Sequence, residues 1–257
     1  MYYLSNAINK IDFMITKEIN KKQVRLYDSI DELPITRFHK YNKLLLIDSG
    51  IGSDLSDIDS HIERLYRYIK HDSKEAIQEL QNMRQSLYMV NQEISPKFLA
   101  FAALVESIDG VKNDDLSDEG MRKTLEILKE ASNGVISELV DTLKKKVDSE
   151  LKLYFPAIFE DASLKEYYDK LKVRTKVVLD GIIEGKDIDE ELEKIDFELL
   201  SYSKPKVFSG KDSEEIKFDK QFENMCLLIG QKLNKDAKLM NVLEYYNAFD
   251  YIRNEKK

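Results

Sequence analysis

The stretch from Ser73 to Ile94 reads SKEAIQELQNMRQSLYMVNQEI and carries the clearest periodic pattern in the chain. Heptad-like spacing of apolar residues places them on one side of an α-helix, where a partner helix can cover them. The stretch therefore predicts a long helix with Ser73 as its N-cap. The apolar row steps by four, three, four, three and four residues through Ala76, Leu80, Met83, Leu87, Val90 and Ile94.

The helical period continues on both sides of this stretch. From residue 54 to residue 200, apolar residues recur at helical spacing between capping and breaking residues. One predicted helix covers Lys97–Ser107 and is closed by Asp109 and Gly110. Further helix starts are predicted at Ser95 with Pro96, at Ser117, at Ser163, and at a capping box of Asp187 and Glu190.

Turn-forming residues are scarce in the 257-residue chain. Nine Gly and four Pro make up about 5% of it, where average usage is roughly 12%. This composition disfavours sandwiches and barrels and favours long helices. The sequence therefore predicts an all-α (mainly α) irregular multi-helix bundle. It allows at most a short β element near the N-terminus, at Lys22–Tyr27, where Val24 and Leu26 alternate with polar residues.

Four segments are predicted. Residues 1–53 form a mixed or extended N-terminal segment that packs on the bundle or on a neighbour, and residues 54–200 form the helical core. Residues 201–213 contain Pro205 and Gly210 among polar residues and are the predicted linker. Residues 214–257 form a two-helix module whose second helix starts with a capping box of Asn241 and Glu244.

Charge and cysteine usage narrow the function classes. The chain has 48 Asp and Glu against 40 Lys and Arg, a formal charge of −8, so we expect no sequence-specific nucleic-acid partner. Cys226 is the single cysteine, which excludes an intrachain disulfide and a multi-cysteine zinc site. We also expect no secretion and no membrane partner, because the chain shows neither a signal-peptide pattern nor about 18 consecutive apolar residues.

Asp54, Asp57 and His61 are the candidate metal ligands, with Asp59 nearby in a D-x-x-D-x-D-x-H pattern. Carboxylates and imidazole together can bind a cation. Carboxylates at a helix start also accept hydrogen bonds from unpaired backbone amides, and this is the favoured interpretation. We therefore predict no metal, no other cofactor and no catalytic residue, with metal ligation by Asp54, Asp57 and His61 as the alternative.

Aromatic residues are abundant, with 14 Tyr and 11 Phe. Tyr245 and Tyr246 are adjacent in a predicted helix, and neighbours on a helix point in different directions. Tyrosine is also enriched at protein interfaces. Together with Phe249, this pair is the predicted contact of the C-terminal module with another chain.

Two stretches resemble a known group of proteins. Residues 26–62, LYDSIDELPITRFHKYNKLLLIDSGIGSDLSDIDSHI, resemble a segment of proteins encoded among the virion-structure genes of tailed phages of gut Bacteroidetes, in particular the crAss-like phages. Residues 218–253, FDKQFENMCLLIGQKLNKDAKLMNVLEYYNAFDYIR, are similar to the small helical module that ends such proteins and to some phage tail-assembly chaperones. The resemblance implies a setting, virion assembly, and carries no functional residue with it.

The resemblance implies a non-enzymatic virion structural protein, assembled in the bacterial host cytoplasm. Within that setting we expect a multi-copy ring subunit of the portal or tail region. It would be a homo-oligomer whose partners are portal, tail or neighbouring ring proteins. A cargo protein packaged in the virion and ejected with DNA is one alternative, and a small helical metal-dependent enzyme or regulator is another.

Overall fold

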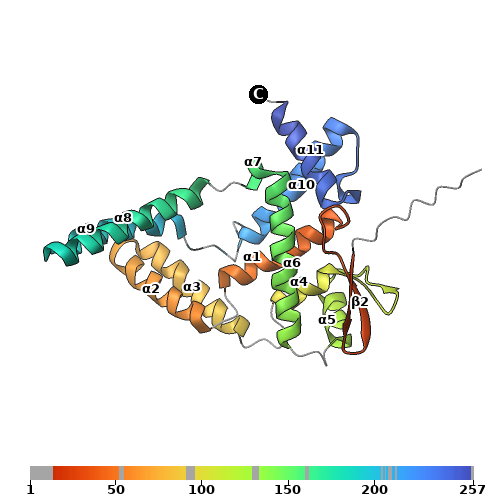
Figure 1. Ribbon diagram of the computed structural model, residues 1–257, viewed down its shortest axis with the longest axis horizontal. Helices are drawn as coiled ribbons and strands as arrows, with labels where there is room; N and C mark the ends of the chain where they lie inside the picture. The colour runs from red at the N-terminus through yellow and green to blue at the C-terminus, as the bar shows by residue number, and fades with distance from the viewer. Residues whose placement is uncertain are drawn as a thin grey trace, which may run out of the picture. The chain divides into compact units, whose positions relative to one another are not determined.

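The computed structural model describes residues 14–51, 55–90, 96–128, 133–159, 162–203, 205, 207, 210, 211 and 213–255. Within these residues it contains eleven α-helices and one four-stranded antiparallel sheet (Figure 1). The prediction of a mainly α-helical chain is therefore confirmed, and the predicted short strand is present as β2.

The strands of the sheet are β1 (Ile15–Ile19), β2 (Lys22–Leu26), β3 (Val105–Ile108) and β4 (Val111–Lys112). The first helices are α1 (Ile35–Ile51), α2 (Leu55–His71), α3 (Ser73–Val90), α4 (Pro96–Leu104), α5 (Asp118–Ile127) and α6 (Asn133–Tyr154). The remaining helices are α7 (Pro156–Phe159), α8 (Ala162–Glu184), α9 (Asp189–Leu200), α10 (Glu214–Leu233) and α11 (Val242–Asn254).

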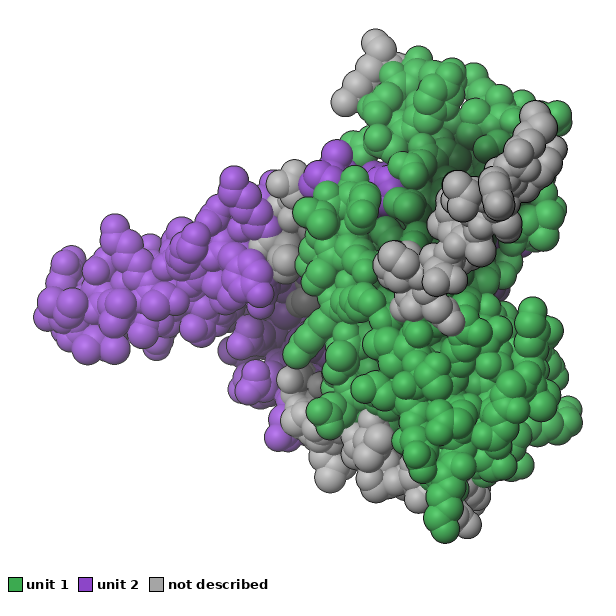
Figure 2. All heavy atoms as spheres, turned by 45° about the vertical axis from the view of Figure 1, so that its right-hand side comes forward, with its two compact units in different colours: residues 1–41, 98–154, 226–257 green, residues 42–97, 155–225 purple. Residues whose placement is uncertain are grey.

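Two compact units divide the chain, and each combines segments that are distant in sequence (Figure 2). Unit 1 comprises residues 1–41, 98–154 and 226–257, and unit 2 comprises residues 42–97 and 155–225. Helices α1 and α10 each contribute residues to both units. These boundaries differ from those of the four segments predicted from the sequence.

Two tight turns build the sheet of unit 1, in the order β1-β2-β3-β4. Asn20 and Lys21 join β1 to β2 with φ values of 51° and 59°, and Asp109 and Gly110 join β3 to β4 with φ values of 50° and 79°. Positive φ at both central residues suits two-residue hairpins, because the twist of such a turn matches that of the strands. The central pairing places Val24 of β2 opposite Ile108 of β3.

The predicted helix Lys97–Ser107 is too long. Helix α4 ends at Leu104, and Val105–Ile108 forms strand β3. Val105 is buried and pairs with Leu26 across the sheet. A β-branched residue in this position packs better on a sheet than in a further turn of helix, and the Asp-Gly turn then reverses the chain.

The C-terminal helix α11 lies in unit 1, where its start is hydrogen-bonded to the segment that precedes α1. Val242 N donates to Leu33 O at 2.9 Å and Leu243 N donates to Ile30 O at 2.9 Å. The structure thus joins residues 30–35 to the end of the chain.

The predicted capping box of α11 is present. The Asn241 side chain accepts from Glu244 N at 2.8 Å, and Glu244 Oε2 accepts from Asn241 N at 3.2 Å. The box predicted at Asp187 and Glu190 is absent, because the N-cap of α9 is Ile188, which makes no side-chain capping bond.

Unit 2 contains two helical hairpins, α2–α3 and α8–α9 (Figure 1). Tyr68 of α2, Ala76 of α3 and Leu200 of α9 form a buried cluster, and the Tyr68 hydroxyl donates to Leu200 O at 3.2 Å. The predicted apolar row of α3 is only partly right. Ala76 is buried, but Leu80 and Leu87 are 43% and 42% exposed.

Candidate functional site

His61, the imidazole of the predicted metal ligands, belongs to a buried cluster between α2 and α3. Its Nδ1 lies 2.6 Å from Oε1 of Glu79. Arg64 Nε donates to the same carboxylate oxygen at 2.8 Å. His61 is 2% exposed and Glu79 is 1% exposed. The arrangement links the two helices of the hairpin through one carboxylate.

The side chains of the other two candidate ligands, Asp54 and Asp57, are not part of the described structure. Asp54 lies outside the described residues, and Asp57 lies in α2 with its side chain outside the description. Within the part of the chain that the structure describes, no three His, Cys, Asp or Glu side chains are grouped so that they could hold a metal ion. The Nδ1 atom of His61 contacts the Glu79 carboxylate.

Sequence reasoning missed Glu79, which is 18 residues from His61. The signal was its position, because Glu79 follows Ala76 by three residues and precedes Met83 by four, inside the apolar row of α3. A carboxylate in such a row is buried only with cationic or hydrogen-bonding partners. A carboxylate at such a position therefore predicts a His, Lys or Arg partner on the neighbouring helix.

Tyr245 and Tyr246 of the predicted interface point to different parts of unit 1. Tyr245 is buried, and this burial raises the pKa of its hydroxyl, with Cys226 on α10 as a lesser cause in the same direction. The Tyr246 ring packs edge-on against Phe38 of α1, with ring centroids 6.3 Å apart. Burial raises the pKa of Tyr246 to about 12. Both side chains therefore find partners within the chain, and their contact with another chain stays a prediction.

Phe249, the third predicted interface residue, is partly buried on α11. Its contact with another chain stays a prediction, as does that of the tyrosine pair. Since Tyr245 is 6% exposed, any such contact through α11 has to use the outer parts of Tyr246 and Phe249.

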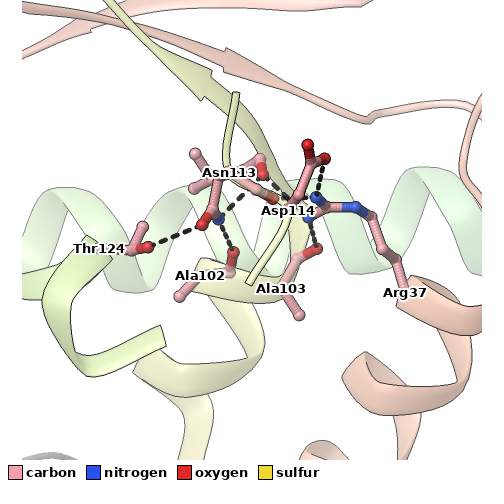
Figure 3. A network of polar contacts seen from close by, with 7 residues as sticks. Arg37, Ala102, Ala103, Asn113, Asp114 and Thr124 are labelled. Atoms are coloured by element: carbon pink, nitrogen blue, oxygen red, sulfur yellow. Dashed lines mark hydrogen bonds and ion pairs between the residues drawn. The ribbon is translucent and has the colours of Figure 1, made fainter. Parts of the chain in front are cut away.

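A second polar network in unit 1 surrounds the C-terminus of α4 (Figure 3). Arg37 of α1 is buried and donates to Ala103 O at 3.2 Å and to Val105 O at 3.0 Å. Asn113 Nδ2 donates to Ala102 O at 3.1 Å, and its Oδ1 accepts from the Thr124 hydroxyl at 3.1 Å. The last carbonyls of a helix have no partner within it, so these side chains take over that role.

The charge of Arg37 is consistent with this structural role. Burial lowers its pKa, while the Asp114 carboxylate, 3.8 Å away, acts in the opposite direction. Its guanidinium also lies over the Tyr27 ring, 5.4 Å from the centroid. The donors of Arg37 that the structure describes are directed to backbone carbonyls, so this network fixes the change from helix to strand.

Two grooves of about 390 and 400 Å³ lie in unit 2 between α2 and the α8–α9 hairpin. Arg67 and Asp196 line both of them. Asp196 accepts from Arg174 Nε at 2.6 Å and lies 4.0 Å from Arg67. The central charges of the grooves therefore neutralise one another, which makes neither groove a strong site for an ion.

Helix α2 has three sides, of which two are covered within unit 2. His61 and Tyr68 face α3. Arg67 and His71 face α9, where His71 packs against the Phe197 ring at a centroid distance of 4.8 Å. The third side carries a row at positions i, i+4 and i+7, which are neighbours on a helix surface. That row is Ile62, Tyr66 and Ile69, of which Tyr66 also lines the groove of about 390 Å³.

The third side of α2 and the adjoining row of α3 form the candidate functional site. Large apolar side chains are normally buried, and a contiguous exposed group of them marks an interaction surface. We call the following five residues the apolar face: Ile62, Tyr66, Ile69, Ile77 and Leu80, which are 49%, 67%, 64%, 60% and 43% exposed.

No protein-family model, curated protein or solved structure matches the chain. Among the described helices, none combines the length and the apolar character needed to cross a bilayer.

Proposed function

We propose that the protein is a non-enzymatic structural protein of a tailed-phage virion, a multi-copy ring subunit of the portal or tail region. The setting comes from the resemblance of residues 26–62 and 218–253 to proteins of the crAss-like phages. In this proposal the chain forms a homo-oligomer, contacts other portal, tail or ring proteins, and is assembled in the bacterial host cytoplasm.

The observation that carries the proposal is the amount of apolar surface on the helices of unit 2. Besides the apolar face, Leu179, Ile182 and Ile183 of α8 are exposed. Soluble monomers rarely leave contiguous patches of this kind uncovered, whereas a subunit of an assembly needs several surfaces that neighbours can cover.

The buried polar groups support an enzyme less well than the exposed apolar surface supports a structural protein. His61, Glu79 and Arg64 bind one another, and Arg37 binds backbone carbonyls. A catalytic base needs to reach a substrate atom within hydrogen-bond distance. Buried groups that satisfy one another in this way serve the packing of α2 on α3 and of α1 on the sheet.

Quantitative mass spectrometry of purified particles tests the proposal. We expect the protein in a fixed copy number per particle, and the same copy number in particles that have released their DNA. Loss of the protein together with the DNA would identify ejected cargo instead. Absence from the particles would contradict both, and stoichiometric metal in the purified protein would then favour the enzyme or regulator.

A further inference from the structure

We propose that the apolar face of the α2–α3 hairpin binds the same face of a second copy of this chain. The inference goes beyond the proposed function, because it concerns self-association in solution and holds whichever assembly contains the protein. It rests on four observations: one continuous surface, sufficient area, complementary charges, and other sides of the hairpin that are already covered.

The exposed rows of α2 and α3 lie on the same side of the hairpin. The helices are antiparallel, since His61 contacts Glu79 near one end and Tyr68 packs with Ala76 near the other. Ile62 is the residue after His61, and Leu80 is the residue after Glu79. When two antiparallel right-handed helices are viewed from one end, successive residues advance clockwise on one and anticlockwise on the other. One residue beyond the contact therefore points to the same side of the hairpin on both helices.

The opposite side of the hairpin is occupied. Arg67 and His71 face α9, and Leu200 of α9 packs on Tyr68 and Ala76. The hairpin is therefore the middle of a layered arrangement that is complete on the α8–α9 side and open on the side of the apolar face. A second hairpin on the open side would complete a helical bundle.

The area of the apolar face suits a dimer. With a fully exposed side chain of this size at roughly 200 Å², the exposed parts amount to about 570 Å² on one copy and about 1,130 Å² across two. Stable protein interfaces begin near this value. A face that binds itself reaches the threshold without any other partner, because two-fold symmetry uses each contact twice.

The charges at the two ends of the apolar face suit a two-fold arrangement. Asp59 and Arg84 are exposed at the open end of the hairpin, and Asp72 and Lys74 are exposed at the end where α2 meets α3. A two-fold axis parallel to the helices lays α2 of one copy on α3 of the other, with their open ends together. Asp59 then approaches Arg84 of the second copy, and Asp72 approaches Lys74 of the second copy.

The test is the mass of the purified full-length chain, measured by light scattering during size-exclusion chromatography. We expect twice the chain mass of 30.0 kDa. The double variant Ile62→Glu/Ile69→Glu places four carboxylates in the contact. It should weaken association on the order of 100-fold or more. Its circular dichroism spectrum should match that of the original chain, because both side chains are exposed within one copy.

The matched control is Ile182→Glu/Ile183→Glu, which changes two isoleucines on α8 that are even more exposed than Ile62 and Ile69. We expect this control to keep the doubled mass. A single-chain mass for the original protein up to about 100 µM would overturn the inference, whatever else covers the face. An assembly of any size that the face variant leaves intact would overturn it as well. A monomeric chain would not contradict the proposed virion role, which the mass spectrometry of purified particles tests separately.

Discussion

Glu79 determines which side of α3 faces α2. A carboxylate leaves water only where it gains charged or hydrogen-bonding partners, and α2 presents both His61 and Arg64 to it. With Glu79 turned inward, Ala76 and Asn82 are buried beside it, and Leu80 turns outward. The exposure of Leu80, one of the two α3 residues of the apolar face, therefore accompanies the burial of Glu79.

Glu79→Ala should destabilise the protein. The substitution removes the carboxylate that His61 and Arg64 both contact, and removal of one partner from a buried ionic pair costs about 3 kcal/mol. Denaturant titration should show this loss in the free energy of unfolding. Glu63→Ala, at an exposed position of α2, should change it by less than about 0.5 kcal/mol. Equal effects of the two substitutions would show that the cluster adds nothing to stability.

Tyr246 should make the protein sensitive to alkaline pH. Burial raises its pKa in the folded chain to about 12 from its usual value of 10.0. The unfolded chain therefore loses this proton first, so stability is fully present below about pH 10 and falls as the pH rises towards 12. The loss attributable to Tyr246 is up to about 2 kcal/mol.

Denaturant titrations between pH 9 and pH 12 measure this effect. Tyr246→Phe should show a smaller alkaline loss than the original chain, and Tyr66→Phe, at an exposed position, should behave as the original does. An unchanged slope in Tyr246→Phe would mean that other groups cause the alkaline loss.

At the scale of elements, local chemistry predicted the starts of α4 and α5 correctly, but it was wrong on the cap of α9 and on the end of α4. Pro96 opens α4 and Ser117 caps α5 as expected, because an N-cap needs only residues within one turn. The end of α4 depends instead on Val105 meeting Leu26, some 80 residues away in the sequence. Apolar spacing contains no information on such pairs, although the Asp109-Gly110 turn was a readable hairpin signal.

Asn241→Ala should weaken the start of α11 by about 2 kcal/mol. The side chain accepts from Glu244 N and donates to Asp31 O at 2.7 Å, and a lost cap and a lost hydrogen bond each cost about 1 kcal/mol. Thermal unfolding measures the effect. Asn247→Ala, at an exposed position of the same helix, is the control and should be near neutral.

Two helical glycines should respond in opposite directions to alanine. A Cβ at Gly181 of α8 would lie 2.7 Å from the Ile188 side chain, so Gly181→Ala should cost about 1–3 kcal/mol. A Cβ at Gly230 of α10 would lie 3.8 Å from its nearest neighbour, Lys235 O, so Gly230→Ala should gain up to about 1 kcal/mol. Calorimetry of both variants checks the pair, and a stabilised Gly181→Ala would refute the close approach of α8 to Ile188.

At the scale of the whole molecule, the sequence predicted the helical class but not the units. His61 was recognisable as a notable residue, yet its partner Glu79 comes from another helix. Likewise, the pairing of residues 30–35 with the start of α11 joins segments about 200 residues apart in the sequence. Long-range pairs of this kind depend on the complete fold, which no local spacing specifies.

Truncation after Leu239 should therefore damage unit 1 and spare the hairpins of unit 2. It removes α11, to which residues 30–35 are bonded, while α2, α3, α8 and α9 stay in the chain. Hydrogen exchange should show lost protection in residues 30–38 and β2 and retained protection in α2 and α3. A chain truncated after Glu255 is the control. Retained protection in residues 30–38 would contradict the role of α11.

Synthesis on the ribosome gives the closure of residues 30–35 by α11 a further meaning. Asn241, the hydrogen-bond partner of Asp31, is 210 residues later in the chain. Its synthesis follows that of Asp31 by about 10–40 s at 5–20 residues per second. All of unit 2 has been synthesised before that moment, since it ends at residue 225. The carbonyls of Ile30 and Leu33, residues that are buried in the finished protein, receive their bonds from Leu243 N and Val242 N only when α11 emerges. A chain that terminates before α11 therefore keeps these two backbone acceptors open beside an apolar segment that proteases and chaperones can recognise.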